Sequence, residues 1–327
     1  MSKVLGIGNA LVDILIRLKE DDLLNELKLQ KGSMQLVDRD FQDQVFSKTQ
    51  QLNKTQASGG SSANTIHGLA SLGVETAYIG KVGNDELGDF FAEDLKNSKI
   101  KPFLKHSETS TGVALALISP DSERTFGTYL GAAVEVNAQD LDENLFAGYQ
   151  FFHLEGYLVL NTELVETALK LAKARNMIVS LDLASFNVVE AHLEFLRNIT
   201  RKYVDIIFAN EDEAKAFTGK EPEEALHEIA SMCSIAVVKI GKNGSLIKQG
   251  NDEYRVGAIP SNVIDTTGAG DLYAAGFLYG MVKGFGIDRC AHIGALLAGK
   301  VIEVIGAKID NEVWSAIKEQ VKRIEAA

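Results

Sequence analysis

Short apolar runs alternate with stretches of helical periodicity along most of the chain. Near-continuous apolar runs predict buried strands at 3–8, 77–82, 151–154, 177–183, 204–209 and 235–240. Apolar residues that recur every three or four positions predict helices at 65–72, 162–175, 188–200, 211–217 and 222–232. Because apolar strands separated by helices form parallel sheets covered on both faces, the pattern predicts an α/β fold with a mainly parallel sheet.

Two pairs of predicted strands lack a helix between them. These pairs are 13–17 with 32–37, and 112–118 with 124–130. Pro, Asp and Ser at 119–123 favour a turn, so we expect the second pair to form a hairpin. We therefore predict a single domain over residues 1–327, with a small β-sheet lid contributed by about 10–50 and 105–132.

The composition narrows the classes of protein that fit this pattern. Hydrophobic residues make up 46% of the chain and charged residues 24%, which is the balance of a folded globule. With 45 acidic against 33 basic side chains, the formal charge of −12 would repel the phosphate backbone of a nucleic acid. No apolar run reaches the ~18 residues that cross a bilayer, and the start of the chain has no signal-peptide layout. We expect a soluble, cytoplasmic protein that binds neither nucleic acid nor membranes.

The segment DTTGAGD at 265–271 is the strongest chemical signal. It opens an apolar helix, where backbone N–H groups and the helix dipole favour an anion. Gly268 and Gly270 let those N–H groups turn towards phosphate oxygens, and Asp271 is placed to accept a proton from a hydroxyl that attacks the phosphate. A glycine-rich turn in which Asp271 merely caps the helix explains the same residues.

Two segments nearer the N-terminus are candidates for contact with a ligand. Gly59 and Gly60 permit close approach to the backbone, and Asn64 offers a donor and an acceptor to a polyol. A flexible loop before a helix is the alternative. Asn9 and Asp13 follow the first predicted strand, which lacks the third glycine of a dinucleotide-binding motif, and are placed to face sugar hydroxyls.

Two later segments also follow predicted strands. Asn210 and Glu213 are placed to organise Mg²⁺ through water, and a helix cap with its capping-box partner explains them equally well. Gly241 and Gly244 would line a nucleotide or form a hairpin turn into 245–248. The chain contains no GxxxxGK[ST], HExxH or GxSxG sequence, which excludes a P-loop, a zincin-type metal site and a hydrolase nucleophile elbow.

The order of these segments resembles the ribokinase-like (PfkB-type) family of sugar and nucleoside kinases. The resemblance rests on an early GGxxxN, an NxxE two-thirds along the chain and the DTTGAGD segment, and it covers nearly the whole chain. Five segments are similar to those of adenosine kinases in particular, namely 8–15, 58–66, 152–159, 203–214 and 265–278. The resemblance implies a ribokinase-like fold, in which a mainly parallel, Rossmann-like sheet lies between helices and carries the β-sheet lid.

The resemblance also implies roles for residues around the acceptor. Asp271 would be the base on the acceptor hydroxyl, and Arg124 of the lid would neutralise the transferring phosphoryl group. An anion hole would be formed by Gly268, Ala269 and Gly270. The residues implied for the acceptor itself are Asn9, Asp13, Gly59, Gly60, Asn64 and Tyr157, the last as an aromatic ring stacked on adenine.

For the nucleotide, the resemblance implies ATP held by Asn210, Lys239, Gly241, Gly244 and Thr266. Lysine at 239 replaces the threonine that is frequent there in the family. Glu213, with Asn210, would organise Mg²⁺ through water. Some relatives also bind a monovalent cation near the positions of Asp265 and Thr267.

Together these observations predict an ATP- and Mg²⁺-dependent kinase that phosphorylates a primary hydroxyl. The first hypothesis for the acceptor is the 5′-hydroxyl of adenosine, which implies a role in purine salvage. A free sugar such as ribose or fructose is the alternative, because the serines at 61 and 62 also suit sugar kinases. A catalytically silent nucleoside-binding protein is a third interpretation, which the intact Asp271 disfavours. Relatives act as monomers or pair through their lids, so a monomer or homodimer is expected.

Overall fold

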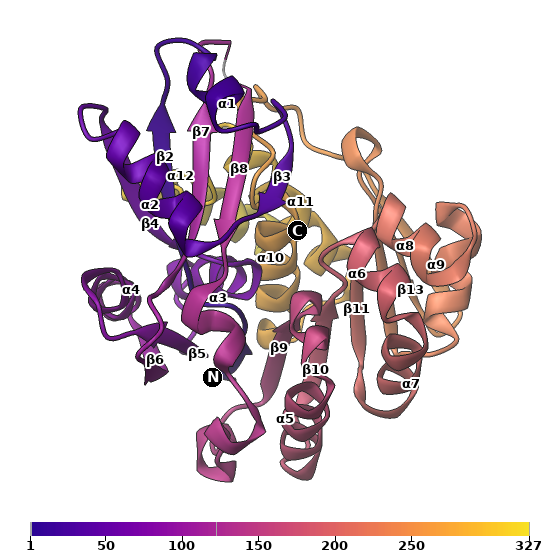
Figure 1. The fold of residues 1–327 in the computed structure, drawn as a ribbon. Helices are drawn as coiled ribbons and strands as arrows, with labels where there is room; N and C mark the ends of the chain where they lie inside the picture. Colours follow the sequence, from indigo (N-terminus) through magenta and orange to yellow (C-terminus); the bar gives the residue numbers. More distant parts are fainter. Residues whose placement is uncertain (1, 122, 327) are drawn as a thin grey trace.

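A large β-sheet forms the centre of the molecule in the computed structural model, which describes residues 2–121 and 123–326 (Figure 1). Over those residues its nine strands run in the order β14, β13, β12, β11, β10, β9, β1, β5, β6. The strands from β12 to β6 are parallel, whereas β13 and β14 form an antiparallel edge. Their bounds are Val4–Ile7 for β1, Thr76–Gly83 for β5, Ile100–Ser107 for β6, Phe151–Glu155 for β9, Ile178–Asp182 for β10, Ile206–Asn210 for β11, Ile235–Lys239 for β12, Ser245–Gln249 for β13 and Asp252–Val256 for β14.

Helices cover both faces of this sheet, because successive strand residues point to opposite sides. In β11, Phe208 packs into one hydrophobic core and its neighbour Ile207 into the other. The first core contains residues of α3 (Ser61–Ser71), α4 (Glu86–Asn97), α10 (Ala269–Lys283), α11 (Ile287–Val301) and α12 (Asn311–Ala326). The second contains residues of α5 (Thr162–Ala174), α6 (Phe186–Ala191), α7 (Leu193–Tyr203), α8 (Glu211–Thr218) and α9 (Pro222–Ala230).

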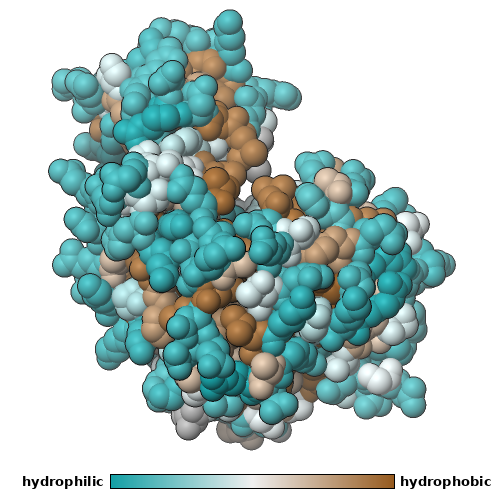
Figure 2. All heavy atoms as spheres, turned by 60° about the horizontal axis from the view of Figure 1, so that its bottom comes forward, coloured by the Kyte–Doolittle hydropathy of each residue, from teal (hydrophilic) through white to brown (hydrophobic). Residues whose placement is uncertain are grey.

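A small second sheet projects from one end of the large one (Figure 1). Its strands lie in the order β3 (Met34–Leu36), β8 (Arg124–Tyr129), β7 (Gly112–Ile118), β2 (Leu11–Arg17) and β4 (Lys54–Gly59). The chain between β2 and β4 also forms α1 (Asp22–Glu26) and α2 (Arg39–Lys48). Short 3₁₀ helices occupy Gly131–Glu135, Ala138–Asp140, Glu143–Phe146, Gly156–Leu160 and Gly241–Asn243. Figure 2 shows hydrophobic side chains along the notch between the projecting part and the rest of the molecule.

The predicted fold class is confirmed: helices flank a large, mostly parallel sheet that carries a second small one. Strands β7 and β8 form the expected antiparallel hairpin, with Ile118 opposite Arg124, although Ser122 of its turn lies outside the described residues. That the small sheet acts as a lid stays a prediction. Among the described residues, none of the helices combines the length and apolar character that spanning a membrane requires.

Three local expectations differ from the structure. The helix expected over 188–200 is two helices, because the chain leaves helical geometry at His192 (φ −126°, ψ 24°). The strands predicted at 13–17 and 32–37 were expected to lack a helix between them, but α1 (Asp22–Glu26) lies there and packs Leu24 into the first core. The apolar pattern did not predict strand β6 at the edge of the large sheet, because the strand contains Pro102 and lacks regular alternation.

Candidate active site

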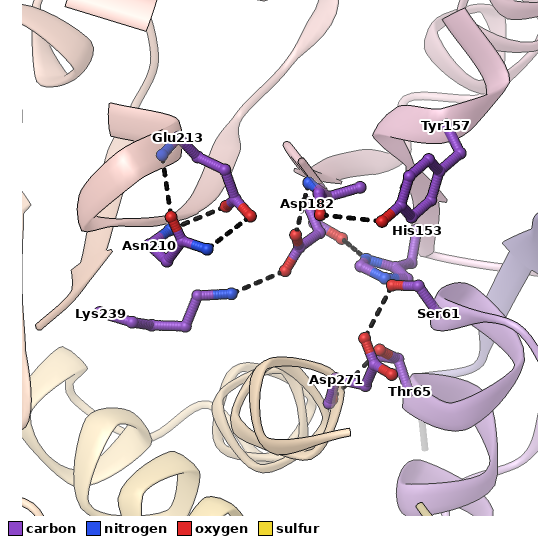
Figure 3. A network of polar contacts seen from close by, with 11 residues as sticks. Ser61, Thr65, His153, Tyr157, Asp182, Asn210, Glu213, Lys239 and Asp271 are labelled. Carbon is purple, nitrogen blue, oxygen red and sulfur yellow. Dashed lines mark hydrogen bonds and ion pairs between the residues drawn. The ribbon is translucent and has the colours of Figure 1, made fainter. Parts of the chain in front are cut away.

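Polar residues gather at the carboxyl ends of neighbouring parallel strands in the large sheet. Strands β1, β9, β10, β11 and β12 all end at this edge, which is where open α/β sheets bind ligands. A cavity of about 920 Å³ opens there. Its polar lining includes Ser61, Tyr157, Asp182, Asn210, Glu213, Lys239, Thr266, Gly270 and Asp271, many of which are drawn in Figure 3. This cavity is the candidate active site.

Asp271 lies in the first turn of α10, and side chains of α3 hold its carboxylate (Figure 3). Ser61 Oγ donates to Oδ1 at 2.7 Å, and Asn64 Nδ2 donates to Oδ2 at 3.0 Å. Burial raises the pKa of Asp271 to about 6, while the two hydrogen bonds act to lower it. The carboxylate is therefore ionised at neutral pH and able to accept a proton from a hydroxyl.

Asn64 also keeps one polar atom for another partner. Its Oδ1 is buried and accepts no hydrogen bond from any described residue. Buried polar atoms without partners are uncommon in folded proteins, and a ligand that binds beside such an atom can supply the missing donor. Asn64 thus supports Asp271 through Nδ2, while its Oδ1 has no partner among the described residues, and its contact with a ligand hydroxyl stays a prediction.

The first turn of α10 presents backbone N–H groups beside Asp271. The N–H groups of Gly268 and Gly270 have no acceptor among the described residues, whereas that of Ala269 donates to the carbonyl of Thr266 at 3.2 Å. No side chain caps this helix start. Free N–H groups at the positive end of a helix bind anions, so two of the three residues expected in the anion hole offer unused donors.

Lys239 and Asp182 form a largely buried ion pair next to that turn, with side chains that are 15% and 6% exposed (Figure 3). They end β12 and β10, and their Nζ and Oδ2 atoms lie 3.0 Å apart. Asp182 Oδ1 accepts a second hydrogen bond, from the backbone of Ala184 at 3.0 Å. Lys239 therefore lines the cavity as expected for it, and sequence reasoning missed its partner Asp182.

Asn210 and Glu213 form the capping box that was one of the two interpretations of their sequence. Asn210 Oδ1 accepts from the backbone of Glu213 at 2.8 Å, and Glu213 Oε2 accepts from the backbone of Asn210 at 2.8 Å. Asn210 Nδ2 donates to Glu213 Oε1 at 2.7 Å. Both residues also line the cavity. Burial, and then the nearby charge of Asp182, raise the pKa of Glu213 to about 7.

The arrangement of these carboxylates suits Mg²⁺ held through water. Mg²⁺ usually keeps several waters and takes one or two carboxylates together with substrate phosphates. Asp182 and Glu213 face the same cavity and repel each other electrostatically, an effect that a shared cation removes. Over the described part of the chain, no group of three or more His, Cys, Asp and Glu forms a closed metal cage. Asp182 and Glu213 would therefore hold such an ion through water and not by full protein coordination.

A second residue that sequence reasoning missed is Glu155, at the end of β9. Its Oε1 accepts from the backbone and the side-chain amide of Asn9, both at 2.9 Å, and its Oε2 accepts from the backbone of Ser62 at 2.8 Å. Burial raises the pKa of Glu155 to about 7. This carboxylate joins the end of β1 to the first turn of α3. One N–H of the Asn9 side-chain amide is thereby engaged by Glu155, and a contact of Asn9 with a sugar hydroxyl stays a prediction.

Gly59 and Gly60 lie against protein groups that leave no room for a side chain. A Cβ at Gly60, where φ is +96°, would lie 2.2 Å from the carbonyl oxygen of Asn9. A Cβ at Gly59 would lie 2.3 Å from the carboxyl carbon of Asp13. The two glycines thus let β1, β2 and α3 meet closely, which positions the acceptor side of the site.

The small sheet contributes Asp13 and Arg124. Arg124 is paired with Asp265, and its guanidinium also donates to Thr267 Oγ1 at 3.3 Å. Asp265 accepts a further hydrogen bond from the backbone of Gly306 at 2.6 Å. Protein donors therefore already engage the carboxylate near which a monovalent cation binds in some relatives. Arg124 reaches the segment that contains Asp271, and burial raises the pKa of Asp13 to about 7.

The remaining expected residues line the cavity further from Asp271. Tyr157 donates its hydroxyl to the carbonyl of Ala184 at 3.2 Å, beside Asp182 (Figure 3). Thr266, Gly241 and Gly244 also line the cavity. An apolar wall next to them is formed by Ala258, Ile259, Pro260, Val263, Ala295, Ala298 and Ile302. The cavity therefore joins a charged region at α10 to an apolar slot suited to a flat ring.

Comparisons with known proteins agree with this geometry. Residues 34–314 match the model of the pfkB family carbohydrate kinases. A solved structure of adenosine kinase from Sinorhizobium meliloti is 35% identical, covers 98% of this chain and 99% of its own, and superposes with a TM-score of 0.87. An uncharacterized sugar kinase of Archaeoglobus fulgidus is 31% identical over 74% of this chain and 96% of its own. A 5-dehydro-2-deoxygluconokinase of Geobacillus thermodenitrificans is 28% identical over 84% of this chain and 86% of its own.

Proposed function

The chain belongs to the pfkB family of carbohydrate kinases, and we propose that it transfers the γ-phosphoryl group of ATP to the 5′-hydroxyl of adenosine. Family membership makes it a phosphotransferase; the acceptor is the step that we add. The similarity to the adenosine kinase of Sinorhizobium meliloti over almost the whole chain supports that acceptor. The sugar kinase relatives make a free sugar the competing acceptor.

The observation that carries this proposal is the apolar surface of the small sheet that faces the site. Arg124 identifies this surface, because its side chain reaches Asp265 and Thr267. Side chains on the same surface follow from the strand period of two and the cross-strand register. Its apolar part includes Leu15, Ala114, Ala116, Phe126 and Leu36, and the polar residues Asp13, Arg17 and Thr128 lie on the same surface. Leu36 is 66% exposed although it is large and apolar. The hydrophobic side chains along the notch in Figure 2 agree with an apolar surface on this side of the small sheet.

Such a surface suits a nucleoside better than a free sugar. A free hexose or pentose carries hydroxyls around its ring, and each one that is buried needs a hydrogen-bond partner. A nucleoside presents hydroxyls along the ribose edge and a flat base beyond it. Asp13 and Asn64 supply polar groups for the former, and the apolar surface containing Phe126 and Leu36 is available for the latter.

The proposed reaction follows from the groups around Asp271. Asp271 accepts the proton of the 5′-hydroxyl as that oxygen attacks the γ-phosphorus. The free N–H groups of Gly268 and Gly270 stabilise the negative charge that develops on the phosphoryl oxygens. Asp182 and Glu213 would hold Mg²⁺ through water, and the ion would supply further charge neutralisation at the phosphates. The small sheet closes over the acceptor and keeps water from competing as a nucleophile.

An acceptor panel tests the proposal. ADP release is measured with adenosine, inosine, cytidine, ribose, fructose and 5-dehydro-2-deoxygluconate at equal concentrations. We expect the highest kcat/KM with adenosine and a product phosphorylated at the 5′ position, identified by ³¹P NMR. A higher kcat/KM for any free sugar than for adenosine would overturn the acceptor assignment and leave the kinase assignment intact.

A further inference from the structure

The ammonium group of Lys239 occupies an unusual position for a lysine. Lys239 is the last residue of β12, its side chain is only 15% exposed, and its Nζ lies 3.0 Å from Asp182 Oδ2. A Cβ placed on Gly270 would lie 2.9 Å from Lys239 Nζ, so the ammonium sits directly on the first turn of α10. That turn is the one whose free N–H groups face the cavity.

This position places a positive charge at the end of a helix where a bound anion would be favoured. The N-terminus of a helix carries a partial positive charge, which repels an ammonium group. The carboxylate of Asp182 lies 3.0 Å from the ammonium nitrogen and pairs with it. A phosphate at this place would meet the ammonium and the helix N–H groups together.

Arg124, the cation expected to neutralise the transferring group, is engaged elsewhere. Its guanidinium is paired with Asp265, and both side chains of that pair are nearly buried. Arg124 does not line the cavity, whereas Lys239 lines it together with Gly270 and Asp271. The positively charged side chain that lies beside the expected anion hole is therefore Lys239.

We propose that Lys239 is a catalytic residue that donates hydrogen bonds to the γ-phosphoryl oxygens during transfer, with Asp182 as the residue that positions it. The proposal rests on the kinase function and is independent of which alcohol is the acceptor. In the step, the bond between the γ-phosphorus and the β-bridging oxygen breaks, and a bond from the γ-phosphorus to the acceptor oxygen forms. The hydroxyl proton goes to Asp271, ADP leaves with the electron pair of the broken bond, and Lys239 keeps its proton.

The test compares Lys239→Met with Lys248→Met. Lys248 lies on the adjacent strand β13 and is also paired with a carboxylate, Glu253, at 2.7 Å, but it is not part of the cavity. With the acceptor that gives the highest turnover, we expect K239M to lower kcat about 10²–10³-fold, the range for loss of one preorganised donor. The Kd for ADP, which lacks the γ-phosphate, should change by less than about threefold. K248M should leave both values unchanged.

Two further variants separate this role from a purely structural one. Lys239→Arg keeps the charge, so the kcat of K239R should be at least about tenfold higher than that of K239M. Asp182→Asn should lower kcat in the wild-type background, and the double variant should lose less than the product of the two single losses, because residues that act as a unit are not additive. Should K239M fail to bind ADP, Lys239→Gln takes its place with the same criteria.

A kcat within threefold of wild type in a K239M protein that binds ADP would overturn the proposal. The proposal would also fail if K239R is no more active than K239M. Loss of adenosine as the preferred acceptor would leave these results unaffected, so the failure of this inference and that of the proposed acceptor are distinguishable.

Discussion

At the residue scale, the chemistry depends on a carboxylate whose surroundings act on it in opposite directions. Burial raises the pKa of Asp271 to about 6, and the hydrogen bonds from Asn64 and Ser61 oppose that rise. Both oxygens of the carboxylate are thus supported by α3. The result is a base whose pKa lies below neutral pH but closer to it than that of an ordinary aspartate.

Replacing this base tests its role directly. Asp271→Asn keeps the size of the side chain and both neighbours of the carboxylate, so we expect an unchanged fold and ADP affinity. Without a group that accepts the hydroxyl proton, kcat should fall about 10²–10⁴-fold. Steady-state kinetics, together with a thermal melt and ADP titration, check this expectation. Near-normal turnover in a folded, ADP-binding variant would exclude Asp271 as the base.

The supporting hydrogen bonds predict a shift in the pH profile. The bond from Ser61 favours the ionised form of Asp271, so its loss raises the pKa of that carboxyl. In Ser61→Ala, the acidic limb of kcat/KM against pH should therefore move to higher pH, while the plateau at high pH changes less. Ser71, near the end of the same helix, provides the control, since S71A should leave the limb in place. A limb that moves to lower pH would contradict this account of Asp271.

Sequence reasoning identified residues that stand in a local motif and missed those that act across the sheet. Asp271 lies in a recognisable segment, and Lys239 attracted attention because it departs from a known pattern. Asp182 and Glu155 are single carboxylates at the ends of apolar strands. Their roles arise only when the strand order brings β10 near β12 and β9 beside β1, and no local pattern encodes that order. A carboxylate at the end of a predicted parallel strand is the signal that would have found both.

At the scale of elements, the central strands and the helices α3, α5, α8 and α9 followed from periodicity, whereas the small sheet followed only in part. The apolar runs of β9, β10, β11 and β12 mark buried parallel strands on their own. Strand β3 has only three residues, and its partner β8 lies far away in the chain. Such long-range pairing is decided by packing, which the pattern of a short segment does not contain.

The contact between the small sheet and the segment before α10 predicts a change in dynamics. Arg124 of β8 is paired with Asp265, and both side chains are nearly buried, so removing one partner leaves the other charge buried and uncompensated. Asp265→Asn weakens that link while keeping the shape of the side chain. We expect faster hydrogen exchange in β7 and β8 and a KM for the acceptor that rises about tenfold. Unchanged exchange in these strands would show that the pair does not hold the small sheet.

An exposed ion pair serves as the control for this variant. Arg255 on β14 is paired with Glu223, and both side chains are more than half exposed. Arg255→Gln should alter neither the exchange of β7 and β8 nor the acceptor KM, because exposed pairs contribute little to stability. An equal effect of both variants would point to a general loss of stability instead of a specific link.

At the scale of the whole molecule, the two cores enclose a site with an excess of buried carboxylates. Burial raises the pKa of Asp13, Glu155 and Glu213 to about 7 and that of Asp271 to about 6. Aspartate and glutamate in an unfolded chain titrate near pH 4. The ligand-free folded protein therefore binds more protons than the unfolded chain between about pH 4 and 7, and this part of its stability increases as the pH falls through that window.

Two buried histidines and a buried lysine change the pH dependence of stability in the opposite direction, and they decide in which pH range the effect of the carboxylates is best measured. Burial lowers the pKa of His67 well below its ordinary value and that of His153 to about 4. Below about pH 6.5 the unfolded chain therefore protonates these histidines and the folded protein does not, so the free energy of unfolding falls as the pH drops. Burial also lowers the pKa of Lys308 to about 8, which matters mainly above that pH. Between pH 7.5 and 6.5 the carboxylates outnumber these groups.

We therefore expect the ligand-free protein to become more stable as the pH falls from 7.5 to 6.5. Differential scanning calorimetry in matched buffers should show a Tm that is higher at pH 6.5 by about 2 °C or more, the size expected for a change of about 1 kcal/mol. Glu155→Gln removes one of the titrating carboxyls, so its Tm should rise less over the same interval. A Tm that falls between pH 7.5 and 6.5 would mean that the buried histidines dominate. Saturating nucleotide and Mg²⁺ should flatten the dependence, since bound cations favour the ionised carboxylates and remove the proton uptake that causes it.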